Sequence, residues 1–173
     1  MHDLAALRAR LAPDPIPRER TRALHEVRRS AVDRRGVYAR RDLPLGEPVL
    51  TFTGDLVAAA TVPDHLHALQ VGPALWLVTP PGSEDIEDYV NHGCAPNLGF
   101  IDGTLTLRAL RPIRAGEELL WDYATAIDEP GWGFECRCGA LACRGRVAAF
   151  SALAPEGRDR LRPLALAYLR DLP

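Results

Sequence analysis

The sequence predicts one mainly β domain with peripheral helices, an α+β arrangement, and three observations support this. Short apolar runs alternate with turns rich in Gly, Pro and Asp between residues 36 and 123. Leucines at helical spacing stand near the two ends of the chain. The 173 residues, of which 47% are hydrophobic, suffice to enclose one core. Many short strands with flanking helices are typical of a β-rich domain.

The first 31 residues predict an N-terminal helical arm. Three leucines recur at helical spacing up to Leu11, and three prolines then end that run. A second short helix is expected from Glu19 to Ser30, with Leu24 and Val27 on its apolar face. Such an arm serves either as a docking element or as a helical cap packed on the domain.

The central part predicts short strands. Apolar runs bounded by turn residues place these strands at 36–39, 48–53, 56–57, 74–79 and 117–123. The stretch 98–110 predicts a hairpin, because Asp102-Gly103 favours a tight primed turn. From Pro155 the apolar residues again recur at helical spacing, so we expect a C-terminal helix within 148–173.

The four cysteines predict a metal site built from two distant stretches of the chain. Cys136, Cys138 and Cys143 cluster near the C-terminus, and Cys94 follows the polar pair Asn91-His92. Four thiolates complete one tetrahedral zinc site. The alternative is two disulfides, with three possible connectivities. The N-terminus has no apolar signal-peptide core, so a reducing compartment is expected, and there thiols stay free or bind metal.

The charge distribution suggests a cationic partner. Residues 1–41 hold 11 Arg against five acids, whereas residues 42–173 hold ten Arg against 18 acids. The acidic main body suits a basic peptide better than a nucleic-acid backbone, although a solvated acidic surface is an equal alternative. No apolar run is long enough to span a membrane. All 21 Lys and Arg positions are arginine, which suggests a GC-rich, bacterial source. Since no signal-peptide core is found, a cytoplasmic protein is expected.

Several stretches, in order along the chain, resemble the SET-domain family of protein-lysine N-methyltransferases. They are Arg35–Ala39 with Leu45–Glu47, Phe52–Asp55 (Y-x-G-E), Asp88–Asn97 (R-F-x-N-H-S-C-x-P-N), Ala115–Tyr123 (G-E-E-L-x-x-D-Y) and the C-x-C-G-x3-C-R-G run that resembles a post-SET zinc segment. The resemblance implies a β-clip fold of small curved sheets with a C-terminal pseudoknot. It places a SET domain at 32–130 and the post-SET segment at 131–147.

The resemblance implies S-adenosylmethionine as methyl donor and one zinc ion. Zinc would be held by Cys94, Cys136, Cys138 and Cys143. The donor would lie against Arg35, Gly36, Val37, Tyr38, Tyr89, Asn91 and His92, with Phe134 and Arg137 near the adenine or the lysine channel. Gly36 would let the backbone approach the ligand closely.

The resemblance implies Tyr123 as the catalytic residue, with Phe52 and Trp121 beside it in a substrate channel. A lysine amine has a pKa near 10.4 and must lose a proton before it attacks a methyl group. The Tyr123 hydroxyl would orient the amine or the methyl. Trp121 stands where the family usually has Phe or Tyr, and its lack of a hydroxyl favours di- or trimethylation.

Four departures from the family pattern concern the donor pocket. Arg34 replaces the first Gly of G-x-G, Asp55 replaces Glu, Asp88 replaces a frequent Arg, and Gly93 replaces Ser. The alternative function is a non-catalytic SET-fold module that binds a basic peptide around a structural zinc. A zinc-ribbon-like nucleic-acid binder is disfavoured, because two separated C-x-x-C knuckles are missing. The sequence does not specify the oligomeric state.

Overall fold

The computed structural model describes residues 16–58, 62 and 67–172. Its strands are β1 (His25–Arg29), β2 (Arg35–Ala39), β3 (Pro48–Thr51), β4 (Asp55–Ala58), β5 (His67–Gly72), β6 (Leu75–Thr79), β7 (Asn91–His92), β8 (Leu98–Phe100), β9 (Thr106–Ala109), β10 (Leu120–Trp121), β11 (Gly133–Glu135) and β12 (Arg146–Ala148). Its helices are α2 (Arg18–Leu24), α3 (Pro155–Leu161) and α4 (Ala167–Arg170), with 3-10 turns η1 (Ile86–Tyr89), η2 (Tyr123–Thr125), η3 (Phe150–Ala152) and η4 (Arg162–Leu164).

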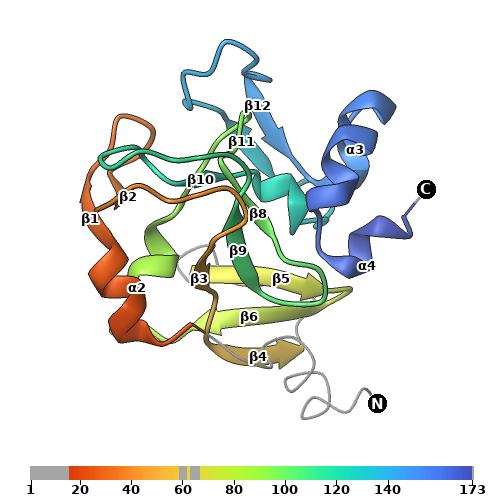
Figure 1. Ribbon diagram of the computed structural model, residues 1–173. Helices are drawn as coiled ribbons and strands as arrows, with labels where there is room; N and C mark the ends of the chain where they lie inside the picture. The colour runs from red at the N-terminus through yellow and green to blue at the C-terminus, as the bar shows by residue number, and fades with distance from the viewer. Residues whose placement is uncertain (1–15, 59–61, 63–66, 173) are drawn as a thin grey trace.

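The described strands form five small sheets, which confirms the mainly β prediction. Two are three-stranded, in the orders β3-β9-β8 and β4-β6-β5, and three are pairs: β1-β2, β10-β7 and β11-β12. In Figure 1, α2 and β1 lie on one side of the molecule and α3 and α4 on the opposite side. None of the described helices is long and apolar enough to cross a membrane.

The sheet β3-β9-β8 forms the centre of the core. Strands β8 and β9 form the predicted hairpin, with Leu98 opposite Ala109 and Phe100 opposite Leu107. The side chains of Leu50, Phe100 and Leu107 are at most 1% exposed. Burial of such side chains supplies most of the driving force for folding.

The sheet β4-β6-β5 contains a strand that the sequence did not predict. Strand β5 interrupts its apolar residues with Gln70, whose buried amide oxygen accepts a hydrogen bond from Asp128 N at 2.7 Å. A tight turn joins β5 to β6, and Ala74 in this turn has a positive φ of 52°. The polar residue within the strand conceals the apolar pattern, although it satisfies a distant backbone group.

The N-terminal prediction was wrong over residues 25–29. Helix α2 ends at Leu24, and the chain continues as β1, which pairs antiparallel with β2. His25 is 1% exposed and its Nε2 donates to Val49 O at 2.9 Å. Pairing with β2 satisfies the backbone of this segment and outweighs its weak helical pattern. The predicted first helix, with Leu4, Leu7 and Leu11, lies outside the described residues.

The C-terminal segment is helical but is not one helix, which corrects the prediction for 148–173. Pro163 lies in the separate 3-10 turn η4, and Ala165 is extended before α4 starts. Proline cannot donate the backbone hydrogen bond that a continuous helix needs. The short helices enclose a second apolar cluster of Ala124, Phe150, Leu153, Leu161, Ala165 and Leu169. This cluster packs on the turn that follows β10, since Leu166 N donates to Thr125 O at 2.8 Å.

Residues 117–121 bond to two separate parts of the chain. On one side Leu119 N donates to Val37 O at 2.7 Å. On the other side, β10 pairs parallel with β7, and Gly93 N donates to Trp121 O at 3.0 Å. This is the contact between the Asn-His loop and the Tyr123 segment that the predicted pseudoknot requires.

Candidate active site

The parallel pair β7-β10 brings Asn91 and His92 beside Tyr123, which follows β10 directly. Asn97 fixes this pairing with both ends of its side-chain amide. Its Nδ2 donates to Glu118 O at 2.8 Å, and its Oδ1 accepts from Leu120 N at 2.8 Å. Two motifs far apart in the sequence therefore meet at one place.

His92 connects Tyr123 to the cysteine cluster. Its Nδ1 accepts a hydrogen bond from Tyr123 N at 3.2 Å, so the ring proton lies on Nε2, which is 3.3 Å from Cys94 Sγ. Burial lowers the pKa of His92 to about 4, against the opposing charge of Asp122. The imidazole is therefore neutral near pH 7, and it donates to the sulfur while it orients the tyrosine backbone.

The Tyr123 hydroxyl donates to Val90 O at 2.9 Å. Desolvation raises the pKa of Tyr123 well above its usual value, and the charges of Asp33 and Glu118 raise it further. The hydroxyl is therefore protonated near neutral pH. It can orient a reacting group through its oxygen lone pairs, but it is not a general base in the phenolate form.

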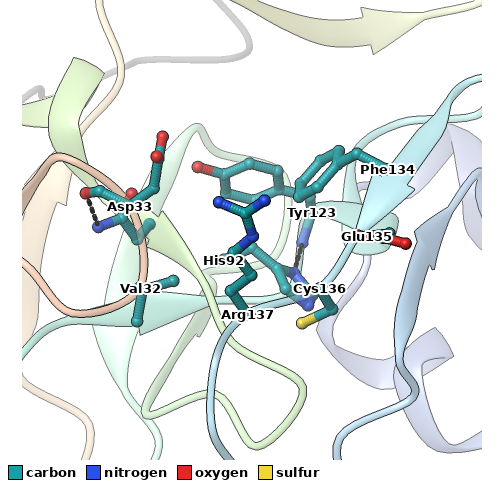
Figure 2. A pocket seen from close by; sticks show the side chains of 9 residues that line it. Val32, Asp33, His92, Tyr123, Phe134, Glu135, Cys136 and Arg137 are labelled. Atoms are coloured by element: carbon teal, nitrogen blue, oxygen red, sulfur yellow. Dashed lines mark hydrogen bonds between the residues drawn. The ribbon is translucent and has the colours of Figure 1, made fainter.

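Tyr123 borders a cavity of about 430 Å³ (Figure 2). The cavity brings together five residues predicted for the donor site or catalysis: Asn91, His92, Tyr123, Phe134 and Arg137. Its lining also includes Cys136, predicted as a zinc ligand, and Val32, Asp33 and Glu135, which were not predicted as site residues. Val32 and Asp33 were missed because residues 19–30 were predicted as a helix, so the β1-β2 hairpin that turns at these two residues was not expected.

The other predicted donor residues lie outside this lining. Val37 is fully buried in the core, and Arg35 stacks on the Tyr89 ring at 4.4 Å. The Tyr38 hydroxyl donates to Glu118 Oε2 at 3.0 Å. The structure therefore gathers Arg35, Gly36, Val37, Tyr38 and Tyr89 in and around β2, beside the cavity rather than on its surface.

Gly36 makes room for a carboxylate. A Cβ at this position would lie 2.1 Å from Glu118 Oε1, which is impossible without movement. The same Oε1 accepts from Ser30 Oγ at 2.7 Å and from Asn91 Nδ2 at 2.9 Å. The missing side chain thus lets Glu118 join the β1-β2 turn to Asn91, whereas the sequence suggested that it admits the ligand.

Tyr123 also borders a second cavity, of about 240 Å³. All three predicted channel residues, Phe52, Trp121 and Tyr123, line it, together with Val90 and Trp132. Its polar lining includes Thr53, His67, Thr79, Glu87 and Asp88. The Phe52 and Trp121 rings pack edge to face at 5.5 Å. Apart from Tyr123, the two cavities have no lining residue in common within the described part of the chain.

The four cysteines converge as predicted. The Sγ atoms of Cys94, Cys136, Cys138 and Cys143 all lie within 4.8 Å of one another. A tetrahedral zinc with Zn–S bonds of about 2.3 Å separates its sulfurs by about 3.8 Å, so this set could bind a zinc ion. Backbone N–H groups of Arg144 and Gly145 donate to two of the sulfurs at 3.4 Å, which favours thiolates.

A buried ion pair ties the cysteine cluster to the residue before Tyr123. The Arg144 guanidinium donates to both oxygens of Asp122, at 2.6 and 2.8 Å, and the Asp122 side chain is fully buried. Asp122 Oδ1 also accepts from Ala124 N at 3.1 Å. Since Arg144 follows the ligand Cys143, this pair fixes the last cysteine relative to the start of η2. In the sequence, the arginine directly after the last cysteine was the signal that could have indicated this ion pair.

Comparison with known proteins identifies the family. A model of the SET domain matches residues 34–124, more than half of the chain. The chain belongs to the SET domain family. The match ends one residue after Tyr123, so the cysteine cluster lies mostly beyond this SET domain match.

Curated relatives of this SET domain protein are named as histone-lysine N-methyltransferases. The human histone-lysine N-methyltransferase 2B is 28% identical over 134 residues, covering 68% of this chain and 5% of the relative. A Cryptococcus neoformans protein named histone-lysine N-methyltransferase, H3 lysine-4 specific, is 31% identical over 136 residues, covering 68% of this chain and 9% of the relative. The chain thus spans less than a tenth of each of these two relatives.

Solved SET structures share the fold. The crystal structure of KRYPTONITE in complex with mCHH DNA, an H3(1-15) peptide and SAH has a TM-score of 0.59 and 29% sequence identity. That likeness covers 72% of this chain and 29% of the KRYPTONITE chain. It agrees with the predicted fold of small sheets.

Proposed function

We propose that this SET domain protein transfers a methyl group from S-adenosylmethionine to the side-chain amine of lysine in a protein or peptide. The observation that carries the proposal is the position of Tyr123, which borders two otherwise separate cavities. One cavity suits the donor and the other suits the lysine, so their reacting atoms would meet at the tyrosine. The curated relatives are named as lysine methyltransferases, and the KRYPTONITE structure contains SAH and an H3 peptide.

The larger cavity has the groups that a nucleoside with an amino-acid tail requires. Phe134 is 42% exposed and offers a ring face to the adenine. Asn91 donates to the backbone of Arg35 through Nδ2, so its Oδ1 is oriented as an acceptor for the amino group of the donor. Bound S-adenosylmethionine supplies an activated methyl on a sulfonium.

The smaller cavity suits a lysine side chain. Its aromatic walls, Phe52, Trp121 and Trp132, cover the aliphatic stem and disfavour the charged amine. Glu87 and Asp88 on the same lining attract the cationic lysine on arrival. The amine must release its proton to solvent before attack, and the neutral Tyr123 hydroxyl then holds the reacting group in line. Positioning of this kind supplies most of the rate.

The finer features of the substrate follow from the same cavity. Its two carboxylates and the acidic main body suit a basic peptide. The Trp121 indole Nε1 is buried and has no hydrogen-bond partner among the described residues, and the ring brings no hydroxyl to the channel. We therefore expect di- or trimethylated products, which mass spectrometry of a methylated peptide measures.

The test compares donor binding with methyl transfer in the zinc-loaded chain. Calorimetry should show saturable binding of S-adenosylmethionine that Asn91→Ala abolishes. Tyr123→Phe should keep the donor affinity and lower transfer to a lysine peptide by at least about 100-fold. Circular dichroism establishes that both variants are folded. Donor binding without transfer to any basic peptide would instead identify a non-catalytic binding module, and no donor binding would refute the proposal.

A further inference from the structure

The turn between β1 and β2 forms one wall of the larger cavity through Val32 and Asp33. This wall is held in place at several points. Asn91 Nδ2 donates to Asp33 O at 3.3 Å, and Ser30 Oγ accepts from Val32 N at 2.9 Å. Ser30 Oγ in turn donates to Glu118 Oε1 at 2.7 Å. The backbone of Asp33 is therefore fixed relative to Asn91, and its side chain is carried on a supported turn.

The Asp33 carboxylate faces the reacting centre. Figure 2 shows the Asp33 side chain and the Tyr123 hydroxyl pointing toward one another, while Arg137 extends into the same cavity. The charge of Asp33 also contributes to the raised pKa of Tyr123, after desolvation. Glu135 lines the cavity as well, but its side chain points away from Tyr123 in Figure 2. Of these two acidic residues, Asp33 is therefore the one that points toward Tyr123, where the proposed function places methyl transfer.

We propose that Asp33 is a specificity-determining residue that makes the cavity bind the charged methyl donor more tightly than its neutral product. The inference rests on the proposed function and deepens it. In the transfer, the amine lone pair forms the new C–N bond and the electrons of the broken C–S bond stay on sulfur. The positive charge leaves sulfur and passes to the methylated nitrogen. A carboxylate beside Tyr123 therefore attracts the sulfonium and gains nothing from the thioether.

The rest of the ligand does not produce this difference. S-adenosylmethionine and S-adenosylhomocysteine share the adenosine, the amino group and the carboxylate, so contacts of these shared parts with Asn91 and Phe134 cancel in a ratio of affinities. The charge of Arg137 would repel the sulfonium, but it is the same in every variant compared. Asp33 is exposed to solvent, which weakens its field. We expect Asp33 to contribute about three- to fivefold to the preference for the charged ligand.

The experiment titrates both ligands into the zinc-loaded full chain by calorimetry. The variants are Asp33→Asn, which keeps the shape and removes the charge, and the matched control Glu135→Gln. The ratio of the product Kd to the donor Kd should fall about three- to fivefold in Asp33→Asn and stay unchanged in Glu135→Gln. Raising the salt concentration should reduce the ratio in the unsubstituted chain and leave it nearly constant in Asp33→Asn.

Each other outcome contradicts the inference in a recognisable way. An unchanged ratio in Asp33→Asn would overturn it and leave the proposed function intact. Equal weakening of both ligands would show that Asp33 only supports the turn. An equal fall in Glu135→Gln would assign the preference to general cavity charge. If the unsubstituted chain bound neither ligand, the proposed function would fail, and this inference with it.

Discussion

Breaking the buried ion pair between Arg144 and Asp122 should strongly lower the free energy of unfolding. Arg144→Gln removes the guanidinium and leaves the Asp122 carboxylate, whose side chain is fully buried, without its bidentate partner at 2.6 and 2.8 Å. One hydrogen bond to the carboxylate would remain, from Ala124 N. Removal of one partner of a buried pair costs about 3–5 kcal/mol. That is a large part of the roughly 5–15 kcal/mol that stabilises an ordinary domain.

Urea unfolding of the zinc-loaded protein, followed by circular dichroism, measures this loss. The matched control is Arg111→Gln, which breaks an exposed pair with Glu117 of similar length, 2.7 Å, and should cost less than about 1 kcal/mol. The double variant Asp122→Asn with Arg144→Gln should recover much of the stability, because no charge remains buried. A loss for Arg144→Gln no larger than that of the control would refute the reasoning. Zinc content measured on each sample separates loss of the pair from loss of the metal.

Three further predictions concern the backbone, the metal and pH. Arg34 has a positive φ of 28°, so Arg34→Gly should raise the free energy of unfolding by about 1 kcal/mol. The control Arg29→Gly, within β1, should lower the free energy of unfolding. The opposite order of the two variants in urea unfolding would contradict this prediction. Chelation of zinc should weaken donor binding at least about tenfold, because Cys136 itself lines the larger cavity between Phe134 and Arg137, and added zinc should restore the binding. Unchanged calorimetry would speak against a structural metal. Burial lowers the pKa of His25, so below about pH 6.5 the unfolded chain takes up a proton before the folded chain does, and stability falls with falling pH. The variant His25→Gln should therefore show a weaker dependence of the urea midpoint on pH between about 7.5 and 5.5. An equal slope in the variant would exclude a contribution of His25 to the pH dependence.

The sequence predicted the parts of the site that are encoded as local motifs. Cys94 and the three C-terminal cysteines have a spacing typical of a metal site, and the structure brings their sulfurs together. Asn91, His92 and Tyr123 lie within ordered motifs, and the β7-β10 pair joins them. In each case the residue type itself carries the chemical information.

The parts that were missed depend on contacts between distant residues. Residues 25–29 have a weak helical pattern, but pairing with β2 makes them a strand. That error concealed the turn that carries Asp33 to the cavity. Gly36 was expected to let the backbone approach the ligand, and only the position of Glu118 shows which atom occupies the space above it. No local propensity encodes these contacts.

The two cavities at Tyr123 also bear on the order of events during repeated turnover. Because Tyr123 is the only described residue that lines both cavities, the two ligands would approach it by separate routes. A spent donor could then leave and a fresh one enter while the peptide stays in place. Under the proposed function, a chain built in this way would add successive methyl groups within one encounter, so multiply methylated product would accumulate before most of the peptide has been modified once.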